Sequence, residues 1–227
     1  GMDTENDLAC EKIAVLNTLK HVRVFDVRGV VIRIDGEVCA FGIGARLTGV
    51  AMIYQKLNLA LHLTAWENIV LGAESARAGW LNRRAGRERA RGALAQLGHE
   101  CLDLDRPAGS FGIAEQQVIE IARALLVRPR VLILDEPTGV LTPDEADHLF
   151  RILGTLRDQG KTVILITHKL REIIAITDHV SVMRRGEVVA TRETMETDVM
   201  ELAELMVGRH VLMRVEKGPS TPGETVL

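Results

Sequence analysis

The feature that most constrains the fold of this chain is a short aliphatic run that ends in two acids and a proline. Val131 to Leu134 are four consecutive aliphatic residues, and Asp135, Glu136 and Pro137 follow them directly. A run of this length is typical of a strand buried on both faces of a parallel sheet. The acids would then lie at the carboxyl edge of that sheet, where open α/β sheets bind their ligands. They either point into water or handle a cation or a proton there.

Helices and strands alternate around this run. Apolar spacing predicts a helix over 115–127, and residues 162–166 form a second aliphatic segment that predicts a buried strand. Between them, Thr142 predicts a helix cap, because Pro143 occupies the first helical position and Glu145 the third. The order of helix, strand, helix and strand predicts an α/β fold with a mostly parallel sheet and right-handed crossovers.

The other segments carry patterns of their own, which are weakest near the start of the chain. Residues 12–24 have apolar positions at helical spacing and predict a helix, although no cap marks its start. Thr64, followed by Glu67, predicts the capping box of another helix. Further strands are predicted at 30–34, 38–41, 49–54, 180–183 and 188–191, with turns at Asp35-Gly36 and Arg185-Gly186, and further helices within 74–100, up to 176 and over 198–207.

Composition limits the partners of this chain. A net charge of −3 and an aromatic content of 3% favour no nucleic-acid partner. We interpret the helix within 74–100 as a solvated helix whose Ala90, Leu94 and Leu97 face inward and which Gly98 ends. Its basic residues are Arg83, Arg84, Arg87, Arg89 and Arg91. Three widely spaced cysteines indicate a reducing compartment, and no apolar run approaches the roughly 18 residues of a membrane span.

Two further polar side chains close predicted strands. His168 ends the strand that follows Asp135 and Glu136 in the chain, and successive parallel strands usually lie side by side. We therefore expect His168 near Glu136 at one edge of the sheet, where an imidazole can serve in acid–base chemistry. Gln55 also closes a strand, and its amide can coordinate a water or a metal.

These residues belong to motifs that, in their order and spacing, resemble the ATP-binding cassette (ABC) ATPases. The motifs are the Q-loop at 49–55 with its following segment at 63–69, the signature helix at 111–117 and 120–125, the Walker B strand at 131–137, the D-loop at 140–142 and the switch histidine at 166–168. The residues are most similar to the importers of sugars and nucleosides, whose ATPases carry two cassettes in one chain. Residues 214–219 resemble their inter-cassette linker, so the resemblance covers about 29–218.

The resemblance implies a P-loop NTPase-like fold: a mostly parallel sheet with flanking helices, a small β part and a helical subdomain at about 72–127. Residues 1–211 would form this domain, and residues 212–227 would be a linker or tail. The family's first strand and its adenine-stacking aromatic residue would lie before Met2, so the resemblance implies an N-terminally truncated fold.

The resemblance also implies roles for the residues at the sheet edge. Asp135 would hold Mg²⁺, usually through water, with Gln55 as a further ligand. Glu136 would be the general base that polarises the attacking water, and His168 would contact the γ-phosphate of ATP. Phosphoryl transfer is catalysed mainly by positioning and charge stabilisation, so these parts would have to act together.

The signature segment would act on a second cassette. Its residues Gly112, Ala114 and Glu115 would cap the nucleotide of that partner across a head-to-tail dimer. Gly112 stands where the family has a serine, and Ala114 where it usually has a glycine. The other implied partners are membrane permease subunits, which would place the chain in the cytoplasm, bound peripherally to the inner face of the cell membrane.

One family motif is not found in these 227 residues, namely the phosphate-binding string G-x-x-x-x-G-K-[S/T]. Its backbone N–H groups and lysine hold the phosphates of ATP. The nearest string runs from Gly154 to Thr162, but it has five intervening residues rather than four and lies between a helix and a strand. Residues 5–12 are faintly similar to the family's E-N-G-A-G-K and make Lys12 the candidate nucleotide ligand. Residues 42–46 are an alternative remnant of the loop.

Three hypotheses about function follow from these motifs. The chain is an importer ATPase subunit that couples ATP use to the transport of a sugar or nucleoside, a non-catalytic cassette that docks and pairs, or a truncated remnant. Because the glycine loop is missing, we predict an ATPase-family fold in which this chain alone shows little or no hydrolysis.

Overall fold

The structure is a computed structural model. It describes residues 12–16, 23–25, 31–34, 37–39, 49–74, 76–77, 80–184 and 187–208, with side chains within 49–74, 82–184 and 187–208. Several predicted features lie outside these residues, namely the turns at Asp35-Gly36 and Arg185-Gly186, the segments 5–11 and 42–46, and the tail from residue 212 onward. Within the described ranges, no helix is long and apolar enough to cross a bilayer.

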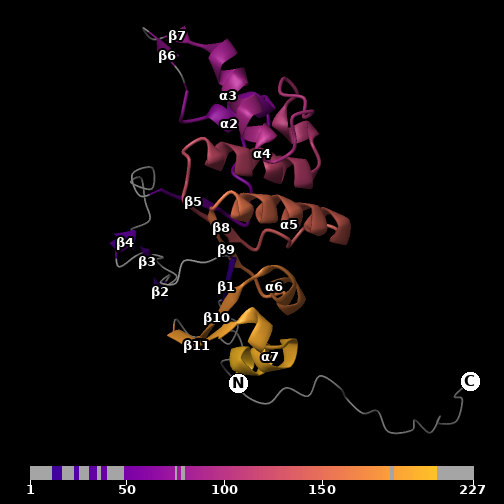
Figure 1. The fold of residues 1–227 in the computed structure, drawn as a ribbon. Helices are drawn as coiled ribbons and strands as arrows, with labels where there is room; N and C mark the ends of the chain where they lie inside the picture. The colour runs from indigo at the N-terminus through magenta and orange to yellow at the C-terminus, as the bar shows by residue number, and fades with distance from the viewer. Residues whose placement is uncertain are drawn as a thin grey trace, which may run out of the picture.

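A six-stranded sheet runs through the middle of the molecule in the order β11-β10-β1-β9-β8-β5 (Figure 1). Its strands are β1 (Lys12–Leu16), β5 (Val50–Ile53), β8 (Val131–Asp135), β9 (Thr162–Ile166), β10 (His179–Arg184) and β11 (Glu187–Glu193). β5, β8 and β9 are parallel neighbours, whereas β1 is antiparallel to both β9 and β10, and β11 to β10. The predicted α/β fold is confirmed, and the parallel part of its sheet consists of β5, β8 and β9.

The prediction of a helix over 12–24 is wrong, because this segment contains two strands instead. β1 covers Lys12–Leu16, and β2 covers Arg23–Phe25. Residues 13–15 pair with β9 on one side and with β10 on the other. Isolated apolar spacing predicts a helix, but an apolar segment that finds backbone partners on both sides is more stable as a strand.

Helices lie beyond both ends of this sheet and beside it (Figure 1). At the β5 end are α2 (Ala65–Val70), α3 (Arg83–Ala95) and α4 (Ile113–Leu125). Near β10 and β11 are α6 (Leu170–Ile176) and α7 (Val199–Val207), and between the two groups is α5 (Pro143–Asp158). Smaller elements are the sheet β2-β3-β4, with β3 (Val31–Ile34) and β4 (Glu37–Cys39), the pair β6 (Ala76–Arg77) and β7 (Trp80–Leu81), and the 3-10 turns η1 (Ala108–Ser110) and η2 (Thr194–Glu196).

The predicted helix starts are confirmed where a local signal was present. The Thr64 side chain accepts a hydrogen bond from Glu67 N, and the Glu67 side chain accepts one from Thr64 N, which completes a capping box on α2. Thr142 and Glu145 form the same box on α5, with proline in the first turn. Such a cap satisfies N–H groups that no helical carbonyl can reach.

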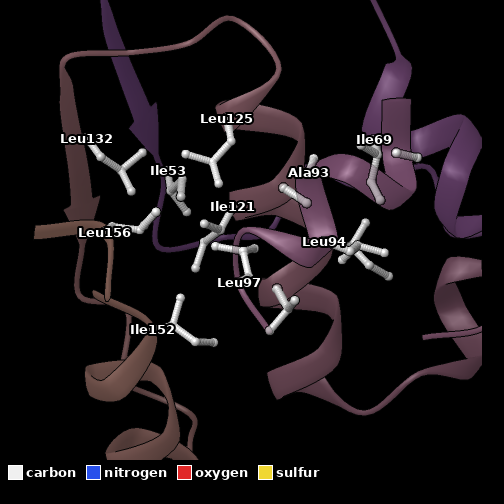
Figure 2. Close-up of a cluster of buried hydrophobic side chains, with 14 of the residues drawn as sticks. Ile53, Ile69, Ala93, Leu94, Leu97, Ile121, Leu125, Leu132, Ile152 and Leu156 are labelled. Carbon is white, nitrogen blue, oxygen red and sulfur yellow. The ribbon is translucent and has the colours of Figure 1, made fainter. Parts of the chain in front are cut away.

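One apolar core joins the helices to the sheet, and Figure 2 shows its centre. Ile53 from β5 and Leu132 from β8 meet Ile121 and Leu125 from α4, and Ile152 from α5 belongs to the same cluster. All of these side chains are buried. α4, which begins two residues before its predicted start, is therefore packed firmly between the helical layer and the carboxylate-bearing strand β8.

Candidate functional site

The predicted acidic edge forms where β8 and β9 end. Asp135 pairs with Ile166 across the parallel strands, and Glu136 N donates to Ile166 O at 2.8 Å. Two residues beyond Ile166, His168 lies beside the acid: its Nδ1 is 2.6 Å from Glu136 Oε1. The expectation that neighbouring strands bring His168 to Glu136 is confirmed. Because a carboxylate accepts, the imidazole nitrogen donates this hydrogen bond.

Glu136 is strained and incompletely satisfied. Its φ of 45° lies in the left-handed region, which non-glycine residues rarely occupy. Its Oε2 is buried and has no hydrogen-bond partner within the described part of the chain. Strain and orphaned polar atoms of this kind concentrate at functional sites, because the surroundings must stabilise a geometry that the residue alone would not adopt.

The charged form of Asp135 is also destabilised by its surroundings. Burial raises the pKa of the Asp135 carboxyl, and the neighbouring Glu136 charge raises it further. A cation placed against both acids would reverse these effects, and carboxylate oxygens are ligands that Mg²⁺ prefers. No cluster of three or more His, Cys, Asp and Glu side chains that could hold a metal occurs among the side chains described. A magnesium ion held by Asp135 would therefore have to take waters or other oxygen ligands as well.

Gln55 follows the same edge one strand away. Ile53 pairs with Leu134, so residue 55 and Glu136 both lie just past the ends of parallel neighbours β5 and β8. Gln55 is exposed. The register places Gln55 at the same edge of the sheet as the acids, and its role as a ligand stays a prediction.

Lys12 reaches this edge from the other side of β9. Ile13 pairs with Ile166, so the backbone of Lys12 lies at the level of Thr167, next to His168. Lys12 begins a strand, however, whereas the lysine of a phosphate-binding loop belongs to the start of a helix. Its role as a nucleotide ligand stays a prediction, and the described residues contain no glycine-rich phosphate loop.

The signature residues gather at the start of α4. Gly112 is the N-cap of this helix, and its backbone N–H donates to Glu115 Oε2 at 3.1 Å. Ala114 lies in the first turn and is partly buried, while its neighbour Ile113 is exposed. The same helix then contacts the acidic edge further along, where Gln117 Nε2 donates to Pro137 O at 3.0 Å.

Two side chains at this edge received no role in the sequence analysis. Gln117 is buried and hydrogen-bonded to Pro137, and Lys169 Nζ donates to Thr138 O at 2.9 Å. A polar residue on the apolar face of a predicted helix, as Gln117 is, could have signalled a buried hydrogen bond. Lys169 carries no comparable signal, because lysine after a strand is ordinary surface composition.

Known proteins match most of this chain in sequence and in fold. Residues 30–139 match a family model described as ABC transporter. The ribose import ATP-binding protein RbsA 3 of Rubrobacter xylanophilus is 46% identical over 198 residues, which cover 86% of this chain and 40% of that protein. The ribose import ATP-binding protein RbsA of Chromobacterium violaceum is 42% identical over 183 residues, or 81% of this chain and 36% of that protein. The chain thus spans less than half the length of these relatives.

Solved structures share the fold. A nucleotide-free ATP-binding cassette from an ABC transporter aligns with a TM-score of 0.65 and 19% identity, covering 86% of this chain and 98% of that one. The protein cbiO1 of Clostridium perfringens, part of the ABC transporter complex cbiONQ, aligns with a TM-score of 0.61 and 24% identity, covering 78% and 72%. A dimeric ATP-binding cassette bound to ADP and Pi aligns at 0.57 and 24%, covering 73% of each chain.

Proposed function

The chain belongs to the ABC transporter family as an ATPase domain, and from this premise we propose that it powers the import of a sugar by coupling ATP use to transport. The observation that supports catalysis is the contact between His168 and Glu136, beside Asp135, at the ends of two parallel strands. The names of the ribose import relatives support ribose or a closely related sugar as the transported solute.

In this proposal each residue at the edge of the sheet has a separate role. Asp135 and Gln55 would hold Mg²⁺, which when bound supplies positive charge against the phosphate oxygens. Glu136 would accept a hydrogen bond from the attacking water and take up its proton as the general base. His168 holds Glu136 through Nδ1, and its other nitrogen, Nε2, would contact the γ-phosphate.

The proposed partners are a second cassette and membrane permease subunits. Gly112, Ala114 and Glu115 at the start of α4 would cap the nucleotide bound by the second cassette. A dimeric cassette among the structural neighbours supports this arrangement. Permease subunits would hold the chain at the inner face of the membrane. In this proposal, residues 72–127 are the helical subdomain of a domain that covers residues 1–211, followed by a linker.

A second candidate function has its own support. No G-x-x-x-x-G-K-[S/T] string occurs in these 227 residues, and Lys12 begins a strand rather than a helix. A cassette without a phosphate loop would still dock on a permease and pair with a catalytic partner, but it would not itself hold ATP against Glu136.

Magnesium-ATP titration by calorimetry, followed by a phosphate-release assay, separates these functions. If the chain is catalytic, Glu136→Gln should lower turnover by about 10²–10⁴-fold, the usual contribution of a general base. Glu187→Gln, at an exposed acid on β11, is the matched control and should retain turnover. Copurification with a sugar permease without ATP binding would support the docking function. Absence of both nucleotide binding and permease binding would contradict both proposals.

A further inference from the structure

The conformation of Glu136 needs an external cause. Its left-handed φ is unfavourable for a glutamate, and the same backbone turn directs its carboxylate to His168. A residue holds such a conformation only when the surrounding structure over-determines it. The hydrogen bonds to the backbone around Glu136 therefore show which groups maintain the contact.

Three successive carbonyl groups of this turn each accept a hydrogen bond. Gly139 N donates to Glu136 O at 3.1 Å, Gln117 Nε2 to Pro137 O at 3.0 Å, and Lys169 Nζ to Thr138 O at 2.9 Å. The first of these donors is the backbone of the turn itself. The other two are side chains from separate elements, so each ties the turn to a different part of the molecule.

Gln117 ties the turn to helix α4. Its side chain is 4% exposed, so water cannot replace its hydrogen bond to Pro137. The apolar residues of α4 that follow Gln117, beginning with Val118 and Ile119, belong to the buried core, which fixes the position of the helix that carries the amide. Because the signature residues begin the same helix, a displacement of that end would reach Pro137 through a single rigid element.

Lys169 ties the turn to the segment that carries the histidine. It follows His168 in the chain, and its ammonium group also pairs with Glu172 at 3.2 Å. Glu172 in turn accepts a hydrogen bond from Thr138 Oγ1 at 2.7 Å. Thr138 is thus held through both its carbonyl and its hydroxyl. These hydrogen bonds connect the loop that bears Glu136 to the segment after His168.

We propose that Gln117 and Lys169 are positioning residues that hold the turn after β8 in register and thereby keep the Glu136 carboxylate on His168 Nδ1. Neither side chain contacts the reacting groups, so both act through Glu136. This inference rests on the proposed role of Glu136 as the general base. It concerns the free protein, however, so it can be tested without nucleotide.

The tautomer of His168 reports this contact. A carboxylate at Nδ1 selects the neutral imidazole with its proton on Nδ1, and nitrogen NMR of labelled histidine distinguishes that tautomer from the Nε2 form. Spectra are recorded in mildly alkaline buffer, and His168→Gln assigns the signal. Glu136→Ala, which removes the acceptor, defines complete loss of the signature.

The test variants remove one donor each. Gln117→Leu and Lys169→Met should lose most of the Nδ1-protonated signal. Lys169→Arg keeps a cationic donor and should retain it. Gln116→Leu is the matched control, because Gln116 is a buried neighbour on the same helix whose Nε2 donates to Phe111 O at 2.8 Å, away from the turn.

The outcomes separate positioning from general destabilisation. Loss of the signal in the two test variants, with retention in Gln116→Leu and Lys169→Arg, supports the proposal. Retention in both test variants, or equal loss in Gln116→Leu, overturns it. If Gln117→Leu does not fold, Lys169→Met decides, because the Lys169 side chain is 36% exposed and its replacement leaves the core intact. A chain that never hydrolyses ATP would contradict the proposed function while leaving this result unchanged.

Discussion

Carboxylates at the helix starts are hydrogen-bonded to their cap residues, whereas two carboxylates near α4 and the end of β8 keep an oxygen without a partner among the described residues. Glu67 and Glu145 each complete a capping box, and hydrogen bonds from threonine lower the pKa of both carboxyls. Glu120 and Glu136, facing the interior, each keep a buried oxygen without a partner within the described residues. Burial raises the pKa of Glu120, although Asn58 N and Arg123 lower it in part.

The helix caps stabilise the fold, whereas a buried carboxylate oxygen without a hydrogen bond destabilises it. Caps at the surface satisfy every group that they involve, so they stabilise the helices locally. Along α4 the apolar core supplies enough stability to keep buried acids in place, as large cores do at functional sites. The unpartnered oxygen of Glu136 differs from that of Glu120 in that it lies beside Asp135 and His168 at the edge of the sheet.

The largest expected effect tests whether the buried apolar face of α4 supplies the stability that keeps the acids in place. Ile121→Ala removes a fully buried side chain and should lower the free energy of unfolding by about 2–5 kcal/mol, because it leaves a cavity. Ile113→Ala, at a 43% exposed position of the same helix, should change it by less than about 0.5 kcal/mol. Urea unfolding of both variants measures the difference. Similar losses would show that α4 is not anchored by its inner face.

An intermediate effect is expected at the helix start. Thr142→Ala removes the cap of α5 and should cost about 0.5–2 kcal/mol, whereas Thr142→Ser keeps the hydroxyl and most of the stability. Thermal unfolding monitored by circular dichroism compares the two variants. If Thr142→Ala unfolds at the same temperature as Thr142→Ser, the cap does not stabilise α5, and the proposed difference between the helix starts and the interior is wrong.

The smallest expected effect is on the pH dependence of the free energy of unfolding, which should have opposite signs for Glu120 and Glu67. The pKa of Glu120 is raised above its ordinary 4.5, so the folded chain binds the extra proton, and stability falls as pH rises from about 4.5 through the folded pKa. Glu120→Gln should flatten that decline. Glu67 has a lowered pKa, so its contribution is present above about 4.5 and is lost as pH falls through its folded pKa.

Denaturant unfolding at several pH values checks both signs. Glu67→Gln should weaken the loss of stability on acidification and leave the neutral-to-mildly-acidic slope unchanged. Glu120→Gln should do the reverse. Identical pH profiles for the two variants would mean that burial does not distinguish these glutamates.

Much of the site followed from the sequence because its signals are local or depend on a general topology rule. Val131 to Leu134 predicted a buried strand, and its acids were expected at the carboxyl edge. His168 was expected beside Glu136 because successive parallel strands tend to be neighbours. The 2.6 Å contact confirms that expectation.

Other parts could not be predicted from spacing. The helix predicted over 12–24 is replaced by β1, because the gap between β9 and β10 offers hydrogen-bond partners that no local pattern reveals. The donors Gln117 and Lys169 reach the turn after β8 from distant points in the chain. Such contacts depend on how α4 and the sheet pack.

The sequence by itself determined the alternation of helices and strands, the caps at Thr64 and Thr142, and the order of the family motifs, because each is encoded within a few residues. The tertiary structure decided the antiparallel entry of β1, the left-handed turn at Glu136 and the side chains that hold it. These features depend on groups brought together from separate elements, whose free energy becomes available only when the core has formed.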